Sequence, residues 1–134
     1  MIPSTLVVFG VAAVFEEVGW SGLALDAMQE RLSPVVAGLV LGAIWAAWHY
    51  VPLVQAGRSV GWIAWWTVFT VALRMILVTL YNGTGRSVPI TVVCHAAANV
   101  ATVTFGDFFV PSVTGIVLSL MAAATAVMQH RLAR

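Results

Sequence analysis

The stretch VVAGLVLGAIWAAWHYVPLV, residues 35–54, decides the fold because its length and composition suit a single helical crossing of a bilayer. It contains no Asp, Glu, Lys or Arg, and a membrane-spanning helix needs roughly 20 mainly apolar residues. Ser33 and Pro34 directly before it are typical of a helix start. Gly38 and Gly42 have the spacing that lets two membrane helices approach closely. The stretch therefore predicts a transmembrane helix packed tightly against a neighbour.

Four further apolar segments accompany this helix along the chain. The turn-forming sequence Asn82-Gly83-Thr84-Gly85 ends one of them, because Asn and Gly accept a positive φ. The four segments cover about residues 5–28, 61–81, 88–104 and 112–129. The sequence therefore predicts an all-α fold, a polytopic transmembrane helical bundle of about five membrane segments, with residues 1–134 in a single membrane domain.

Composition makes the lipid bilayer the expected partner. Of 134 residues, 61% are hydrophobic and 8% are charged, whereas a soluble domain carries about 25% charged residues. The formal net charge of +1 gives no support to a nucleic-acid partner. The absence of Lys fits a GC-rich prokaryotic source. Most arginines outside the spans fall on one side of the bilayer and Arg58 on the other, so the positive-inside rule predicts a cytoplasmic C-terminus.

Polar side chains interrupt three of the apolar segments at regular spacings. Glu16 and Glu17 are adjacent, His49 follows Trp45 by one helical turn, and His95 precedes Asn99 (residues 95–99) by one turn. Ionisable groups inside membrane spans are costly and are functional by default. We expect these three helices to assemble one catalytic centre; the alternative is a set of interhelical hydrogen bonds that only holds the bundle together.

The two glutamates are expected to have different tasks. Successive residues of an α-helix point about 100° apart, so one carboxylate reaches the reacting centre while the other supports it. Glu17 stacks on Ser21, and Glu16 stacks on Trp20. Arg74 lies in the middle of the third segment and needs a carboxylate partner, for which Glu17 is the first candidate.

Several common hydrolytic motifs are absent from the sequence. Tyr50 follows His49, so no H-E-x-x-H zinc motif is present, and there is no G-x-S-x-G nucleophile elbow. What is left is carboxylate and imidazole chemistry on water, with or without a metal. Chains of Glu and His also occur in transporters and proton relays, so a small transporter or proton relay is an alternative function.

Three sequence blocks carry a resemblance to a known family. They are EEVGWSG at residues 16–22, WAAWH at 45–49 followed by VPL at 51–53, and NGTGRS at 82–87 leading into HAAAN at 95–99. Together they resemble the CPBP intramembrane protease family, which includes type II CAAX prenyl endopeptidases and the bacteriocin-processing Abi proteins. The resemblance covers about residues 10–105 and leaves an additional C-terminal helix at about 112–130.

This resemblance implies an intramembrane endopeptidase that acts near the C-terminus of prenylated proteins or on small peptides. Glu16 would activate water with help from His49, and His95 and Asn99 would hold the oxyanion. Glu17 and Trp45 would support them. The family is described both as glutamate-dependent and as metal-dependent, so a divalent metal such as zinc stays open as a cofactor.

One position departs from the family pattern. Ser21 stands where the family has Arg, and Ser21 can hydrogen-bond to Glu17 but cannot neutralise it. Glu17 must then be protonated, pair with Arg74, or contact water or a metal, because an unpaired buried carboxylate is strongly penalised. The departure favours a second alternative, a catalytically inactive relative that binds peptides or partner proteins or acts as an immunity protein.

Overall fold

The computed structural model describes residues 2–106 and 109–132, and in these residues it contains helices and no strands. The first helical rod consists of α1 (Ile2–Glu17), the π-helix η1 (Val18–Leu25) and α2 (Asp26–Gln29). The helices that follow are α3 (Pro34–Trp48), α4 (Tyr50–Gln55), α5 (Val60–Gly83), α6 (Val88–Thr104) and α7 (Pro111–Leu132). The predicted all-α fold is confirmed.

Among the residues that the structure describes, three helical stretches are long and apolar enough to cross a membrane. They are Ser4–Gln29, Pro34–Gln55 and Val60–Gly83, and the shorter apolar helices Val88–Thr104 and Pro111–Val127 follow them. These five stretches agree with the segments expected from the sequence, with differences of a few residues at their ends.

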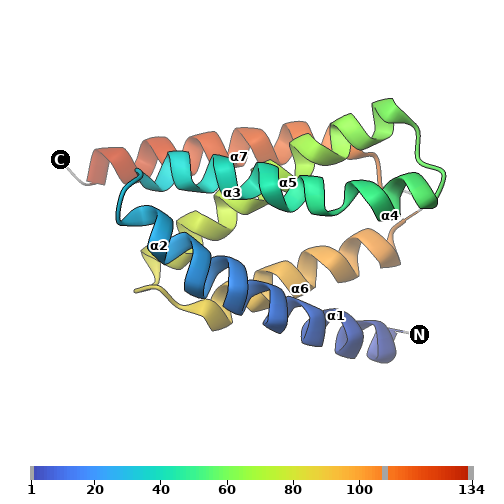
Figure 1. Ribbon diagram of the computed structural model, residues 1–134, viewed down its shortest axis with the longest axis horizontal. Coiled ribbons are helices and arrows are strands. Elements are labelled where there is room, and N and C mark those ends of the chain that lie inside the picture. The colour runs from blue at the N-terminus through green and yellow to red at the C-terminus, as the bar shows by residue number, and fades with distance from the viewer. Residues whose placement is uncertain (1, 107–108, 133–134) are drawn as a thin grey trace.

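The helices form two layers, as Figure 1 shows. One layer contains α3, α5 and α7, with α5 packed against both of the others, and the second layer contains the α1–η1–α2 rod and α6 side by side. Successive long helices run in opposite directions, so α1 begins and α7 ends at opposite ends of the bundle. Glu17 of the first rod, Arg74 of α5 and His95 of α6 meet between these layers.

Two glycines bring α3 against α5, as their spacing predicts. A Cβ atom on Gly42 would lie 3.1 Å from the Cα atom of Val71, and one on Gly38 would lie 2.7 Å from the sulfur of Met75. A larger residue at position 42 would press on the α5 backbone and force the two helices apart, whereas one at position 38 would displace the Met75 side chain. The close approach is what places Trp45, at the next turn of α3, beside Arg74 of α5.

The outer surface of the bundle exposes large apolar side chains, whereas the ion pair of interest lies in the interior. Phe15, Trp48 and Val60 are each more than two-thirds exposed, whereas Glu17 and Arg74 are completely buried. This pattern is what a bilayer requires, because lipid solvates apolar side chains and leaves charged groups to the bundle interior.

Candidate active site

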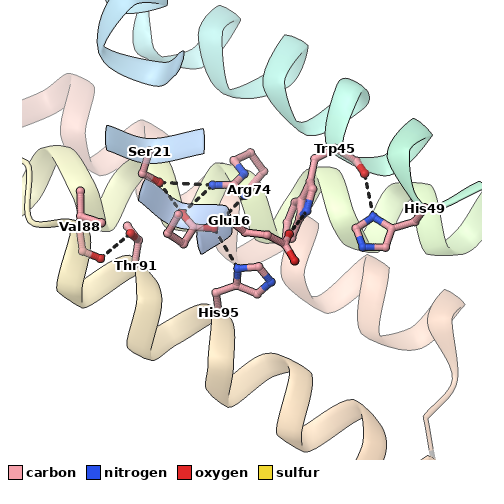
Figure 2. Close-up of polar contacts among 9 residues, drawn as sticks. Glu16, Ser21, Trp45, His49, Arg74, Val88, Thr91 and His95 are labelled. Carbon is pink, nitrogen blue, oxygen red and sulfur yellow. Dashed lines mark hydrogen bonds and ion pairs between the residues drawn. The ribbon is translucent and has the colours of Figure 1, made fainter. Parts of the chain in front are cut away.

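Glu17 is the centre of a buried hydrogen-bond network, and Figure 2 labels three of its partners, Ser21, Arg74 and His95. Its Oε1 atom accepts hydrogen bonds from Arg74 Nη2 and from His95 Nδ1, each at 2.9 Å. Its Oε2 atom accepts from Arg74 Nη1 at 2.9 Å and from the Ser21 hydroxyl. Four donors therefore occupy both oxygens of one carboxylate, and the predicted pairing of Glu17 with Arg74 and with Ser21 is confirmed.

These partners come from three different helices. Glu17 and Ser21 lie where α1 passes into η1, Arg74 lies on α5 and His95 on α6. All four side chains are almost completely buried. The network therefore joins the two layers of the bundle, and the buried cation and carboxylate compensate each other's charge out of contact with bulk solvent.

Glu16 points to a different partner. Its Oε2 atom accepts a hydrogen bond of 2.9 Å from the indole Nε1–H of Trp45, and the side chain is only half-buried. Within the described part of the chain, its second oxygen makes no hydrogen bond. The two glutamates thus diverge as the helical angle predicts, with Glu17 held on all sides and Glu16 left with a free acceptor.

Trp45 contacts Arg74 and His95 in addition to Glu16. Its ring lies under the guanidinium of Arg74 at 4.3 Å and meets the His95 ring edge to face at 4.8 Å between centroids. Figure 2 shows the side chains of Glu16, Trp45 and His95 directed toward one another, with the second ring nitrogen of His95 on the side of Glu16.

His49 contacts Trp45 and is joined to the other candidate residues through it. Its Nδ1–H donates to the backbone oxygen of Trp45 at 2.8 Å, and the two rings meet at 5.8 Å. The lone pair therefore lies on Nε2 in the neutral ring. Trp66 also neighbours this histidine, with ring centroids 6.3 Å apart. No local pattern predicts this contact, because it depends on how α3 meets α5.

A helix break explains the position of His49. Pro52 has no N–H and cannot bond to the carbonyl of residue 48, so the regular helix ends there. At the break, the His49 amide bonds to the carbonyls of Ala46 and Ala47. The carbonyl of Trp45 is thereby left for the His49 side chain.

Asn99 lies apart from the network. It follows His95 by one turn of α6 and is half-buried, and its backbone oxygen accepts a hydrogen bond from the Thr102 hydroxyl at 2.9 Å. Across residues 2–106 and 109–132, no hydrogen bond joins its side chain to the other candidates. The structure therefore gathers Glu16, Glu17, Ser21, Trp45, Arg74 and His95, places His49 at the edge, and leaves Asn99 unengaged.

The π-helix is a feature that sequence reasoning missed. Glu16 and Glu17 lie at the end of the α-helix α1, whereas Val18–Leu25 is a π-helix of 8 residues that begins directly after Glu17. Such segments frequently occur at functional sites. Gly19 and Gly22 lie within it, and glycine lowers the preference for a regular α-helix. Ser21, one of the donors to Glu17, lies within this π-helix.

A groove of about 560 Å³ opens beside Glu16. It lies between the first helical rod and the end of α3, and its other lining residues are Ala12, Phe15, Gly19, Trp20, Ala24 and Trp48. Glu16 is the charged residue in this lining. A peptide segment entering the groove would meet the free carboxylate oxygen in otherwise apolar surroundings.

The candidate residues do not form a metal centre. Among the described residues, no group of three or more His, Cys, Asp or Glu side chains lies close enough to hold an ion. The oxygens of Glu17 are already engaged by four donors, one of which is a guanidinium. The described residues therefore provide no ready ligand set for the zinc that the resemblance leaves open.

The fold and the site define a multi-pass helical membrane protein with a buried carboxylate–imidazole centre. A sequence model of the family described as type II CAAX prenyl endopeptidase Rce1-like matches residues 1–101, and the chain belongs to this family. The match includes every candidate residue named above and ends before α7.

A curated relative gives a shorter match. The chain is 43% identical over 49 residues to CAAX prenyl protease 2 of Methanococcus maripaludis, a region that makes up 37% of this chain and 18% of that protease. The chain thus matches under a fifth of the relative's length. No solved structure matches the chain significantly.

Proposed function

We propose that the protein is an intramembrane endopeptidase that hydrolyses a peptide bond with a water activated by Glu16. The observation that carries this proposal is the unequal state of the two glutamates. Glu17 is fully engaged by Arg74, Ser21 and His95, whereas Glu16 keeps one free oxygen at the wall of an apolar groove. A carboxylate with a free acceptor beside a substrate groove is a suitable general base.

The proposed reaction uses the chain's own side chains. Glu16, assisted by His49 through Nε2, takes a proton from water, and the water oxygen attacks the carbonyl carbon of the substrate. The resulting oxyanion is held by Asn99 Nδ2–H and by the Nε2–H of an imidazolium at His95, whose Nδ1–H donates to Glu17. Collapse of the intermediate breaks the C–N bond, and the proton passes from Glu16 to the leaving amine.

The cavities favour an apolar substrate of the CAAX type. The groove at Glu16 is lined mainly by apolar side chains. A second cavity of about 560 Å³ lies among α5, α6 and α7 and includes Cys94 and Ala98, which neighbour His95 on α6. Space of this kind suits the lipid group of a prenylated C-terminal peptide, and a small apolar peptide is the other substrate class that fits the groove.

The alternative functions have less support. The missing cation at Ser21 favours an inactive relative, but Arg74 brings to Glu17 the positive charge that Ser21 lacks. Membership of a family of endopeptidases does not favour a transporter or a proton relay.

The protein is an integral membrane protein, and we further propose a prokaryotic cell membrane with the C-terminus in the cytoplasm. The opposite ends at which α1 begins and α7 ends support an odd number of crossings. A fluorescent-protein fusion at the C-terminus is expected to fluoresce, and a phosphatase fusion there is expected to be inactive. The reverse pattern would contradict the orientation.

Cleavage by the purified full chain tests the proposed function. The protein is placed in lipid nanodiscs with a farnesylated peptide ending in a CAAX sequence, with the same peptide lacking the lipid, and with a small apolar peptide. Mass spectrometry is expected to find a peptide cut near the C-terminus of the farnesylated substrate. Intact substrates in all three reactions, with a folded protein, would contradict an endopeptidase.

A further inference from the structure

We infer that Arg74 is a positioning residue: by holding Glu17 as a carboxylate it keeps a hydrogen on Nδ1 of the His95 ring, and thereby directs Nε2 to the reacting centre. The role in catalysis rests on the proposed function, whereas the effect on His95 can be measured in a protein that cleaves nothing.

Arg74 and His95 share one oxygen of Glu17 as their acceptor. Arg74 contacts both oxygens of Glu17 at 2.9 Å, which fixes the plane of the carboxylate. His95 Nδ1 donates to Oε1, the same atom that accepts from Arg74 Nη2, also at 2.9 Å. The guanidinium therefore determines where the acceptor for His95 lies.

The chemistry follows from what a carboxyl group can donate. An ionised carboxylate only accepts, so the His95 nitrogen that faces it must carry hydrogen. A buried carboxyl that loses its cation is favoured in the neutral form, and its O–H can then donate to Nδ1. The His95 ring would in that case carry its proton on Nε2 as a neutral donor, which is a weaker oxyanion partner than an imidazolium.

Ser21, in η1, contacts the same Glu17 carboxylate that Arg74 contacts from α5. The Ser21 hydroxyl donates to Oε2 of Glu17 and lies 3.4 Å from Arg74 Nη1. An arginine at position 21, one turn after Glu17, would bring its guanidinium to the place that the Arg74 guanidinium now occupies. The double variant Ser21→Arg/Arg74→Ser keeps the composition and the total side-chain volume, so the guanidinium should be transferable between η1 and α5.

Arg86 provides a matched control. It pairs with Asp26 at 3.3 Å, but its side chain is 62% exposed and lies away from Glu17 and His95. Arg86→Gln therefore removes an arginine–carboxylate contact at the surface and leaves the buried network in place.

The experiment reads the His95 ring directly. The full chain contains three histidines, so selective ¹⁵N-histidine labelling in nanodiscs gives a simple spectrum, assigned with single His→Gln variants. The wild type and Arg86→Gln are expected to show His95 with hydrogen on Nδ1. Arg74→Gln is expected to show Nδ1 without hydrogen, and the double variant is expected to recover the wild-type signal.

Kinetics on the same variants separate positioning from binding. Arg74→Gln is expected to lower kcat about tenfold, with little change in KM, because a neutral donor replaces a charged one at the oxyanion. The double variant is expected to regain most of that loss. If Arg74→Gln is too unstable to study, Arg74→Lys keeps the charge, and it is expected to keep hydrogen on His95 Nδ1.

Two results would overturn the inference. One is an Arg74→Gln protein, folded by circular dichroism, whose His95 still carries hydrogen on Nδ1. The other is an Arg74→Lys or double variant that folds but has lost that hydrogen. If no protein cleaves any peptide while the ring signals follow the expected order, the positioning holds and the peptidase proposal fails alone.

Discussion

Glu17 and Arg74, 57 residues apart in the chain, form an ion pair with two contacts of 2.9 Å in the interior of the bundle. The pair links the first helical rod to α5 and so fastens one layer of the structure to the other. Because the pair is completely buried, Glu17 should contribute more to the stability of the fold than the half-buried Glu16, one residue earlier.

Glu17→Gln is expected to destabilise the fold more than Glu16→Gln. Removing the carboxylate leaves the Arg74 guanidinium buried without its counter-ion, and breaking a buried pair in this way costs about 3–5 kcal/mol. Glu16 is half-buried and loses a single indole contact. Thermal unfolding in detergent measures the difference, and equal midpoints for the two variants would contradict the proposed division between structural and catalytic glutamates.

Trp45→Phe is expected to lower kcat about tenfold with a small effect on stability. The phenyl ring keeps a face for Arg74 but removes the Nε1–H that orients the Glu16 carboxylate, and about 1.4 kcal/mol of lost positioning corresponds to tenfold in rate. Trp65→Phe on the exposed side of α5 is the control. Unchanged turnover in Trp45→Phe would show that this indole does not orient the catalytic carboxylate.

Gly19→Val and Gly42→Val are expected to fail in different ways. A Cβ on Gly19 meets nothing within 4 Å, and this residue lines the groove at Glu16, so the variant should fold normally and raise KM. A Cβ on Gly42 would lie 3.1 Å from the Val71 backbone, so this variant should lose about 1–3 kcal/mol of stability through overpacking. A Gly19→Val protein with unchanged KM would place the substrate elsewhere.

Chelation is expected to leave cleavage unchanged. The described residues provide no group of three metal-binding side chains, and the proposed steps use Glu16, His49, His95 and Asn99 alone. Activity in EDTA, with and without added zinc, is the measurement. Loss of activity in EDTA that zinc restores would require a rearranged site.

Much of the site could be predicted because local rules apply to it. The divergence of Glu16 and Glu17 follows from helical geometry, and the partner of Arg74 follows from the cost of an isolated buried charge. The contact between α3 and α5 follows from Gly38 and Gly42, whose missing side chains permit it.

The remainder depends on packing between distant segments. The hydrogen bond from Trp45 to Glu16 spans 29 residues, and the groove exists because the first rod and the end of α3 meet at a particular angle. The π-helix also depends on tertiary context, because the sequence of residues 18–25 is compatible with an ordinary α-helix. Asn99 shows that sequence spacing alone is not sufficient. The spacing places Asn99 one turn after His95, but in the part of the fold that is described its side chain makes no hydrogen bond to the other candidate residues.

The most direct test of the central claim is the rate at which purified Glu16→Gln cleaves a farnesylated CAAX peptide, measured beside the wild type and Glu30→Gln. Glu30 is an exposed glutamate near the end of the same helical rod, so its variant controls for the loss of one carboxylate. The account predicts that wild type and Glu30→Gln cleave at similar rates and that folded Glu16→Gln does not cleave. Cleavage by Glu16→Gln at the wild-type rate would contradict it.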